Sequence, residues 1–552
     1  MPDSAAAAAA PDVLIVGAGP VGLALASDLR RREIQCRLID SAERAVQQTK
    51  AVGIQARTLE MLARLGLAQT AIERGLHTSF FSIYSSDKSL IRMDFQEHLR
   101  GTPYPYVLLL PQNETEQLLT EYVESHGTRI EWQTELIALT QDELGVEAVL
   151  RHPGEQDERI RVGWVVGCDG AHSRVRHLVG LQFVGSTMEQ SFATFAVGNV
   201  RLDWDLSYEE VFAFIHEGNF IGYFPMASGR HRLVIAYDPD RAPTGDVTLE
   251  EIQKAIEVCG PVGARASDPA DLTRFQINQR RSERYRRSRI FLAGDAAHIH
   301  SPIGAQGMNT GIQDAFNLAW KLALTVQGGA SATLLDSYET ERVQVGEALL
   351  RATELTTQLA LTRNPVLAAV RDILTPVLFA TLPMAARRLA HSLGELNVAY
   401  PESPIGVDAR DHKRTPRTGD RAPDGGVQMA EGSTSLFDIF NSQRSIVLVF
   451  AGNQDSAEIA RHWRDIESVI SSGYESVVEA YLVTTQATAG SARALYDQTG
   501  QVHQRYAAAD GEVVLIRPDG YIGFRGPWTA SAAFRGYLRS LFVSAQATHL
   551  PQ

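Results

Sequence analysis

The N-terminal part of the chain contains short, continuous apolar runs, each close to a glycine-rich turn. Residues 13–16 read Val-Leu-Ile-Val, which is typical of a strand buried on both faces of a parallel sheet. A helical pattern over 21–32 and a second strand over 36–40 follow, so this stretch predicts a strand–helix–strand crossover. Residues 163–170 and 290–293 predict two further buried strands, the first of which ends in a tight turn.

The remainder of the chain changes its period. Between residues 186 and 275 apolar and polar residues alternate, and Gly, Asn and Pro separate the runs, which predicts a separate, mainly antiparallel sheet. A long helix is predicted over 310–326, and helical patterns continue after it. Residues 401–434 are rich in Pro, Gly, Asp and Arg and predict a linker, and the strands and helices expected beyond it predict a small α/β domain.

Composition narrows the class of protein. With 552 residues the chain exceeds one ordinary domain, and its formal net charge of -13 argues against general nucleic-acid binding. The three cysteines, Cys36, Cys168 and Cys259, are far apart and predict neither a zinc site nor a disulfide framework. Residues 1–11 lack the features of a secretory signal and predict a disordered tail, and no apolar run reaches the ~18 residues of a membrane span. We therefore expect a cytoplasmic protein with no nucleic-acid, membrane or metal partner.

The first predicted turn has the spacing G-x-G-x-x-G and stands directly between a strand and a helix. We expect Gly17 to permit the tight turn, Gly19 to let a diphosphate approach the backbone, and Gly22 to let the helix pack closely on the sheet. The diphosphate would lie at the helix N-terminus, beside Pro20, where free N–H groups and the helix dipole favour an anion. Asp40 ends the second strand and is placed to accept hydrogen bonds from ribose hydroxyls. This unit predicts a bound dinucleotide but does not choose between NAD and FAD.

A second motif, Gly294-Asp295, decides between these cofactors. A buried strand delivers the pair to a loop, where the Asp295 carboxylate can bind a ribityl hydroxyl that nicotinamide dinucleotides lack. The glycine-rich segment 304–309 follows just before a helix, and its N–H groups are expected to hold the polar edge of an isoalloxazine ring. The sequence therefore predicts FAD, held in part by Gly307, Met308 and Asn309.

Three motifs occur in the order found in one family of enzymes: the turn over 17–22, the segment that runs from Cys168-Asp169-Gly170 to Arg176, and Gly294-Asp295 with its loop. With these motifs the chain resembles the class A flavoprotein aromatic hydroxylases, which share the p-hydroxybenzoate hydroxylase fold. It is similar in particular to the subgroup that contains phenol hydroxylase, pentachlorophenol monooxygenase and the polyketide hydroxylases. The resemblance covers nearly the whole chain.

The resemblance implies an α/β fold with a Rossmann-like FAD-binding domain of the glutathione-reductase type, an antiparallel-sheet substrate domain and a C-terminal thioredoxin-like domain. Because residues 401–552 contain no cysteine, the last of these cannot carry out dithiol chemistry, and we expect it to have a structural or dimer-forming role. The expected ranges are 12–75, 106–185 and 276–400 for the FAD-binding domain, 76–105 and 186–275 for the substrate domain, 401–434 for the linker and 435–552 for the thioredoxin-like domain.

The resemblance also implies roles for individual residues. Asp295 would hold the flavin ribityl group and Asp40 the adenosine ribose, while Asp169 and Arg174 would serve both FAD and NAD(P)H. Lys50 stands where the family has an arginine near the flavin diphosphate, which keeps the charge but loses the bidentate fork.

Three further positions match family residues near the flavin. Arg57 would lie close to the cofactor, Gln112 would contact the flavin, and the carbonyl group of Pro302 would lie near both flavin and substrate. Two departures, Cys168 in place of Ala and Ala305 in place of Gly, are expected to change little.

The activity that the resemblance implies is a monooxygenation. NADPH or NADH would reduce FAD, O2 would add to the reduced ring, and the resulting flavin C4a-hydroperoxide would hydroxylate a phenolic or polycyclic aromatic substrate. A base near the substrate hydroxyl is expected because a phenolate reacts better than a phenol. His300 is the candidate base, whereas His298 is interpreted as a structural part of its segment.

Aromatic residues of the antiparallel sheet are the candidates for the substrate pocket. Alternation puts Phe212 and Phe214 on one face of their strand, and Tyr223 or Phe224 lies close to Pro225 in the next strand. We predict that Phe212, Phe214, Tyr223 and Pro225 line the pocket, with ordinary core packing as the alternative for each aromatic residue.

Other functions remain open at this point. A flavin-dependent halogenase is disfavoured, because none of the 6 tryptophans has a second tryptophan two residues away. A Baeyer–Villiger oxygenase would share the flavin motifs, and a flavoprotein that binds an aromatic compound without turning it over belongs to a different class. The residues do not fix the substrate, the choice between NADH and NADPH, or the oligomeric state, which we expect to be a homodimer or a monomer.

Overall fold

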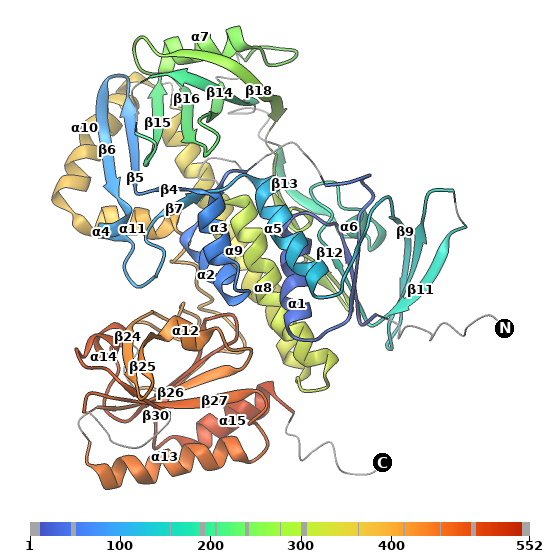
Figure 1. Cartoon of the computed structure of the whole chain (residues 1–552), viewed down its shortest axis with the longest axis vertical. Coiled ribbons are helices and arrows are strands. Elements are labelled where there is room, and N and C mark those ends of the chain that lie inside the picture. The colour runs from blue at the N-terminus through green and yellow to red at the C-terminus, as the bar shows by residue number, and fades with distance from the viewer. Residues whose placement is uncertain are drawn as a thin grey trace.

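The computed structural model describes residues 11–45, 51–154, 156–187, 194–204, 207–237, 242–276, 278–299, 306–362, 364–411, 415–452, 454–486 and 493–543. Figure 1 shows three parts: a central one with a sheet and its helices, a second sheet above it, and a separate α/β unit below. Each part contains at least one buried apolar cluster of its own.

The first sheet has six strands in the order β20-β21-β12-β1-β2-β8, and β1 lies in its interior. All pairs are parallel except β20 with β21. Every residue of β1 is buried, and Ile15 pairs with Leu38 on one side and Val166 on the other, which confirms the predicted crossover. The strands are β1 Val13–Val16, β2 Cys36–Ile39, β8 Ile130–Glu131, β12 Trp164–Gly167, β20 Arg286–Arg287 and β21 Ile290–Leu292.

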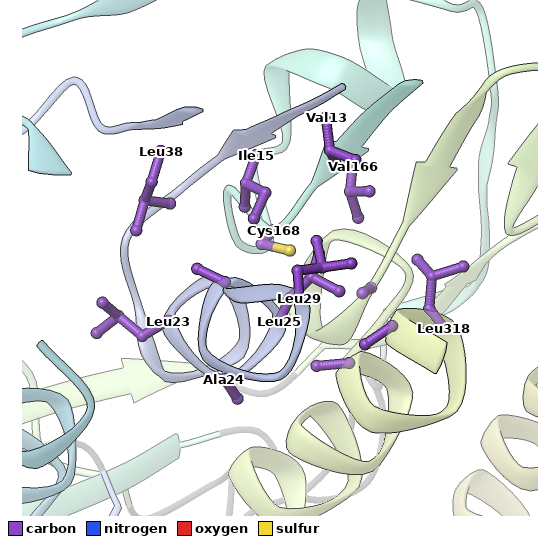
Figure 2. Close-up of a cluster of buried hydrophobic side chains, with 14 of the residues drawn as sticks. Val13, Ile15, Leu23, Ala24, Leu25, Leu29, Leu38, Val166, Cys168 and Leu318 are labelled. Carbon is purple, nitrogen blue, oxygen red and sulfur yellow. The ribbon is translucent and has the colours of Figure 1, made fainter. Parts of the chain in front are cut away.

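Helix α1 (Pro20–Arg31) packs between this sheet and α8 (Gly307–Val326). Figure 2 shows Leu25 and Leu29 of α1 gathered with Ile15 and Val166 of the sheet and Leu318 of α8. Burying a side chain of this size stabilises the fold by roughly 1.5–3 kcal/mol. Four further helices of this part are α2 Ala56–Arg64, α3 Ala68–Arg74, α5 Gln112–Ser125 and α6 Arg174–Leu178.

Three smaller sheets of three strands each extend this part, in the orders β11-β10-β9, β13-β19-β22 and β3-β7-β4. Because β4 pairs with β7, residues 76–78 belong to the first part, whereas the expected range 76–105 placed them in the second. The strands are β3 Gly53–Ile54, β4 Leu76–Thr78, β7 Val107–Leu109, β9 Glu135–Gln141, β10 Val146–Arg151, β11 Glu158–Val162, β13 Phe183–Thr187, β19 Asn278–Ser282 and β22 His298–Ile299.

The second sheet has seven strands in the order β18-β14-β17-β16-β15-β5-β6. Every pair is antiparallel except β15 with β5, so the mainly antiparallel sheet expected from alternation is confirmed. Helix α7 (Leu249–Cys259) covers the face of this sheet that lies away from the first part (Figure 1). The strands are β5 Phe80–Ser85, β6 Lys88–Asp94, β14 Thr194–Asp203, β15 Glu210–His216, β16 Asn219–Pro225, β17 His231–Tyr237 and β18 Arg265–Gln276, and α4 Phe95–His98 follows β6.

Three helices continue the chain after α8: α9 Ala332–Ala360, α10 Pro365–Thr381 and α11 Pro383–Leu393. No single helix among the described residues is long and apolar enough to cross a membrane. The pair α10 and α11 reaches the required length and composition only together, and these two helices meet at a bend of 101°.

The last sheet has eight strands in the order β23-β30-β29-β26-β27-β28-β24-β25, in which β29 and β30 form an antiparallel hairpin. β23, β24 and most of β25 fall within 401–434, so the segment predicted as a linker adds strands to this sheet. β23 and β25 are short edge strands, and such strands carry little hydrophobic alternation. The elements are β23 Val407–Asp408, β24 Gly426–Met429, β25 Gly432–Ser435, β26 Ser445–Gly452, β27 Val478–Thr484, β28 Ala494–Tyr496, β29 Glu512–Ile516, β30 Ile522–Pro527, α12 Leu436–Phe440, α13 Ser456–Ser471, α14 Gln501–Tyr506 and α15 Ser531–Leu541.

Candidate functional site

The turn after β1 requires glycine at two positions and leaves open space at a third. Gly17 has a φ of +105°, and a Cβ atom there would lie 2.4 Å from the carbonyl oxygen of Cys168. A Cβ at Gly22 would lie 1.9 Å from the carbonyl oxygen of Gly17, so α1 approaches the sheet closely only with glycine. A Cβ at Gly19 would meet no atom within 4 Å. A diphosphate can therefore approach the backbone at Gly19.

The N-terminus of α1 offers free N–H groups to an anion. Gly19 is the N-cap, no side chain caps the helix, Pro20 stands in the first turn, and that turn contains no acidic residue. Beside it, the Asp40 carboxylate accepts hydrogen bonds from the backbone N–H groups of Ala18 at 2.7 Å and Ala42 at 2.9 Å. Asp40 thus fixes the shape of the glycine turn and is half-buried at its edge.

Asp169 follows β12, the strand next to β1. Its carboxylate accepts hydrogen bonds from the Ser173 hydroxyl at 2.6 Å and from the Val175 N–H group at 3.0 Å. Burial raises the pKa of Asp169 above its ordinary value, and these hydrogen bonds oppose the shift. Arg174 begins α6 with its side chain exposed, so its guanidinium is accessible to a ligand.

Arg176 connects this segment with the loop that carries Gly294 and Asp295. Its guanidinium donates to the carbonyl oxygens of Ala296 at 2.9 Å and Ala171 at 2.8 Å. It also lies over the ring of Phe183, 3.9 Å from the ring centroid. In the sequence nothing distinguishes this structural arginine from the exposed Arg174 two positions earlier.

Gly294 and Asp295 lie on a single 3-10 turn, η2 (Gly294–Ala296), which follows β21. Gly294 has a φ of +62°, and a Cβ atom there would lie 2.7 Å from a methyl group of Val21. The Asp295 side chain is exposed between the buried residues Gly294 and Ala296. Because Val21 belongs to α1, two motifs that are far apart in the sequence form one site.

The buried carboxylate of Asp314, on α8, holds this turn from behind. It accepts a hydrogen bond from the Gly294 N–H group at 2.9 Å, lies 2.8 Å from Nε2 of His298, and pairs with Arg342 of α9. Burial alone would raise the pKa of Asp314, but Arg342 and His298 lower it to about 2. His298 is therefore a structural residue, as the sequence predicts.

Asn309 ties the start of α8 to β3. Its side chain accepts a hydrogen bond from the Gln55 N–H group at 3.0 Å and donates to the Gly53 carbonyl oxygen at 2.9 Å. Gly307 and Met308 form the first turn of α8, which no side chain caps, so the N–H groups of this turn are available to a ligand.

Gln112 is the first residue of α5. Its side-chain oxygen accepts a hydrogen bond from the Ala51 N–H group at 3.3 Å and so ties α5 to the residues before β3. Three other predicted site residues, Lys50, His300 and Pro302, lie outside the described residues, as does Ala305.

The structure does not bring Arg57 to the cofactor turn. Its guanidinium is fully buried and donates to Glu60 at 2.8 Å and to the carbonyl oxygen of Asp519 at 2.7 Å. It also lies over the ring of Tyr521, 4.9 Å from the centroid. Arg57 thus joins α2 to the C-terminal sheet. The helical pattern around it predicts a buried helix, but it does not show which neighbour each face of that helix meets.

The structure also turns most of the predicted substrate residues away from this site. Phe212, Phe214 and Tyr223 are 6%, 5% and 0% exposed and belong to a cluster that includes Ile252 and Ile256 of α7. Phe212 pairs with Tyr223 across β15 and β16, so their side chains share one face, and Pro225, two residues further on, has the same parity. Alternation correctly groups these residues but does not show which face points toward the first sheet.

The opposite face of the same strands points toward the first part. Phe224 is only partly buried and belongs to a cluster with Val52 and Leu109, which lie in and beside the small sheet near α8. Phe220 is partly buried as well and packs in a neighbouring cluster. Gly222 lies between them, where a Cβ atom would be 3.0 Å from the Phe224 ring.

Comparison with known proteins decides the family. A model described as FAD binding domain matches residues 10–353, and a model described as aromatic-ring hydroxylase, C-terminal, matches residues 415–545. The chain belongs to the FAD-dependent aromatic-ring hydroxylases. The predicted family, the fold class and the FAD cofactor are thereby confirmed.

Relatives of this hydroxylase match along nearly its full length. It is 33% identical to 6-methylpretetramide 4-monooxygenase of Streptomyces rimosus over 98% of this chain and 95% of the relative. It is 31% identical to pentachlorophenol 4-monooxygenase of Sphingobium chlorophenolicum over 93% of each chain. Both relatives are monooxygenases, and this agrees with an oxidoreductase that acts on aromatic compounds.

Two solved structures support the same assignment. The anhydrotetracycline hydroxylase from Streptomyces rimosus has a TM-score of 0.73 at 29% identity and covers 97% of this chain and 100% of its own. Aklavinone-11 hydroxylase, solved with FAD and aklavinone, has a TM-score of 0.74 at 25% identity and covers 98% of this chain and 99% of its own.

The residues present in this hydroxylase fit FAD. The open space at Gly19, the uncapped start of α1 and the exposed carboxylate of Asp295 are the features that a diphosphate and a ribityl chain require. Of the residues that hold these features in place, Asp314 and Arg342 lie outside the three sequence motifs, and Arg176 ends one of them. Asp314 does give a signal of its own, because it is the one carboxylate in α8, a helix rich in apolar residues, and a buried carboxylate needs a partner.

Proposed function

We propose that this hydroxylase consumes NADPH or NADH and O2 and inserts one oxygen atom into a phenolic or polycyclic aromatic substrate. The observation that carries the proposal is the continuity of the site. The first turns of α8 adjoin Val21 after the open Gly19 turn, Gly294 before the exposed Asp295, and Gly53 beside Val52 in the cluster of Phe224. One relative is named for 6-methylpretetramide and another for pentachlorophenol, and these names support an aromatic substrate.

Bound FAD would supply the redox chemistry, since it can accept a hydride from NAD(P)H and pass electrons to O2. In this proposal the N-terminus of α1, with Gly19 and Pro20, binds the diphosphate. Asp40 binds the adenosine ribose and Asp295 the ribityl chain. The N–H groups of Gly307, Met308 and Asn309 hold the polar edge of the flavin and stabilise negative charge on it.

The remaining predicted residues have supporting roles in the proposal. Asp169 and Arg174 serve FAD and the reductant, Gln112 contacts the flavin, and Lys50 neutralises the diphosphate. His300 acts as the base toward the substrate hydroxyl, and the Pro302 carbonyl lies between flavin and substrate.

We assign the substrate to the face of the second sheet that carries Phe220 and Phe224. These rings are only partly buried, whereas Phe214 and Tyr223 on the far face are buried against α7. Partly exposed aromatic rings next to a cofactor site are suited to stacking on an aromatic substrate. They would also exclude water from the site, which limits the loss of oxygen as H2O2 before it reaches the substrate.

We further propose that the enzyme works in the cytoplasm as a homodimer or a monomer, without a nucleic-acid or membrane partner. The net charge of -13 disfavours contact with nucleic acid or anionic lipid. The homodimer is favoured by α10, which leaves apolar side chains such as Ile373, Leu374 and Val377 exposed.

Anaerobic flavin reduction tests the proposal. FAD-loaded protein is mixed with NADPH or NADH, with and without phenols, hydroxybenzoates and polycyclic quinones, and the loss of flavin absorbance is followed. We expect at least one aromatic compound to accelerate reduction, and the preferred nicotinamide to be identified by the faster rate. If no aromatic compound changes the rate although some bind, the chain is a flavoprotein that binds aromatic compounds without hydroxylating them.

A further inference from the structure

A pocket of about 510 Å³ lies where α11, the loop after α4, the segment 415–423 and α14 meet. No residue of the glycine turn, the Asp169 segment or the Gly294 loop lines it. Its size falls within the roughly 300–1,000 Å³ that small-molecule sites occupy. Four arginines line it against one carboxylate: Arg100, Arg387, Arg421 and Arg505 against Asp420.

The arginines at the rim have no carboxylate partner among the described residues. The structure gives Arg387 no hydrogen bond or ion pair to any described residue. Arg100 donates to the carbonyl oxygen of Glu97 at 3.3 Å, and Arg505 donates to that of Asp424 at 2.6 Å. Neither contact brings in a negative charge, so none of these three guanidinium groups forms an ion pair with a described residue, and Asp420 is the one carboxylate among the residues that line the pocket.

The charge at the base of the pocket is also incompletely paired. Arg421 has 7% of its side chain exposed and binds the carboxylate of Glu60, which is almost fully buried. Arg57 binds the same carboxylate at 2.8 Å. One buried carboxylate therefore serves two buried guanidinium groups, and this trio retains a positive charge.

Two further observations point to a missing ligand. The Nε2 atom of His391 is buried without a hydrogen-bond partner, which is rare for a buried polar atom. Burial and the charges of Arg387 and Arg421 lower the pKa of His391 to about 4, in keeping with a surplus of positive charge. The Asp420 carboxylate accepts a hydrogen bond from the Arg417 N–H group at 2.7 Å, and its single negative charge leaves the four arginines of the lining in excess.

We propose that this pocket is a second ligand site, separate from the FAD site, for a small molecule that carries phosphate groups. Guanidinium groups bind phosphate through paired N–H donors, and several of them around one cavity favour a ligand with more than one anionic oxygen. The pocket is a local exception on a chain with a net charge of -13, so it attracts anions that the rest of the surface repels.

The ligand would be linked to the flavin site through the end of α11. The carbonyl oxygen of Ser392 accepts a hydrogen bond from Gln306 at 2.8 Å, directly before α8. Glu395 accepts one from Thr310 of α8 at 3.2 Å. A ligand held by Arg387 and His391 therefore stiffens the helix that carries the proposed flavin-binding N–H groups.

Calorimetric titration of the full-length, FAD-saturated enzyme at low ionic strength tests the site. The probes are pyrophosphate and the adenine-nucleotide half of NADPH with its ribose phosphate. We expect a Kd of about 1 mM or tighter for at least one probe, and a loss of tenfold or more when Arg387→Gln and Arg505→Gln are combined. Both side chains are exposed, so FAD content and folding should be unchanged.

Arg388→Gln is the control for the Arg387 substitution, because it removes one positive charge from the same helix outside the pocket. It should bind both probes like the wild type. Two results would overturn the proposal: a wild-type enzyme that binds neither probe, or a control that loses as much affinity as the double variant. Tenfold tighter binding of the NADPH half favours the nicotinamide cofactor as the source of the phosphate, and equal or weaker binding favours a free phosphate-bearing metabolite.

Discussion

Asp314 serves three groups at once: the Gly294 N–H group, the ring of His298 and the guanidinium of Arg342. Asp314 and Arg342 are fully buried, so removing the carboxylate leaves a buried cation without its partner. We expect Asp314→Asn to lower the free energy of unfolding by about 3–5 kcal/mol and to weaken FAD binding, because the Gly294 turn loses its support.

Denaturant unfolding and FAD titration check this expectation. Asp336→Asn is the control, since its carboxylate pairs with Arg286 but is 69% exposed. This control should cost about 1 kcal/mol or less. Equal losses in the two variants would show that Asp314 is not the support that its contacts indicate.

Glu395 responds to pH in the opposite sense from an ordinary carboxylate. It is buried beside Thr310, and burial raises its pKa from 4.5 to about 8. The folded protein therefore keeps a proton that the unfolded chain has lost, so this contribution to stability is fully present below pH 4.5 and disappears as pH rises through about 8. The loss is up to about 1.4 kcal/mol per pH unit.

Glu395→Gln should remove this dependence, because an amide has no proton to lose in this range. The free energy of unfolding, measured from about pH 5 to 8, should fall in the wild type and stay nearly flat in the variant. Parallel curves would mean that Glu395 is ionised in the folded protein.

At this scale the sequence predicted the motif residues and missed the residues that hold them. Gly17, Gly22 and Gly294 occupy positions where a Cβ atom would collide, so their identity is dictated by local geometry that a short motif reports. Arg57 shows the limit, because its partner Asp519 lies in a distant part of the chain.

Substitutions in the turn between β1 and α1 distinguish an effect on folding from an effect on cofactor binding. Gly19→Ala meets no atom within 4 Å in the protein, so the stability of the apoprotein should change by about 0.5 kcal/mol or less. The added methyl group would occupy the space of the diphosphate, so FAD affinity should fall about tenfold or more. Gly17→Ala, at a φ of +105°, should instead destabilise the apoprotein itself by about 1–3 kcal/mol.

Apoprotein unfolding and FAD titration of both variants give the comparison. Wild-type FAD affinity in Gly19→Ala would be incompatible with a diphosphate at this turn.

The two faces of β15 and β16 make a second comparison possible. Phe224→Leu should change KM or substrate preference, because Phe224 lies on the face that we assign to the substrate. Phe214→Leu should cost about 1–3 kcal/mol of stability and leave KM unchanged, because Phe214 packs under α7. Steady-state kinetics with an identified substrate and thermal unfolding distinguish the two outcomes, and an altered KM in Phe214→Leu alone would reverse the assignment of the faces.

Helices and strands could be predicted where a single pattern of apolar residues extends over a whole buried segment. β1 and the hairpin of β29 and β30 are buried throughout or nearly so, and their patterns are unambiguous. The segment 401–434 escaped recognition because its strands are short and two of them, β23 and β25, lie at the sheet edges, where few apolar residues are needed. The choice of face in β15 and β16 also escaped, because both faces of that sheet are covered and alternation carries no direction.

On the scale of the whole molecule, the C-terminal sheet is attached through a buried ionic network. Glu341 of α9 accepts from Lys321 of α8 at 2.7 Å and from Arg517, which also pairs with Asp519 in the hairpin turn. Buried charges are tolerated only when each one has its partners, so the two parts must fit closely. The C-terminal part, which has no cysteine, thus completes the packing behind α8 and α9. The pairing of residues 341 and 517 has no signature in the sequence.

The central claim is that the chain is an aromatic-ring hydroxylase that inserts one oxygen atom from O2 into the ring of its substrate. It is tested most directly by following NAD(P)H oxidation under isotopically labelled O2 with a panel of phenols and polycyclic quinones, and by comparing labelled product with H2O2. The account predicts that at least one aromatic compound accelerates NAD(P)H oxidation and gains one labelled oxygen atom on its ring. Oxidation that yields only H2O2 with every compound, or an oxygen inserted next to a carbonyl group instead of on the ring, would contradict it.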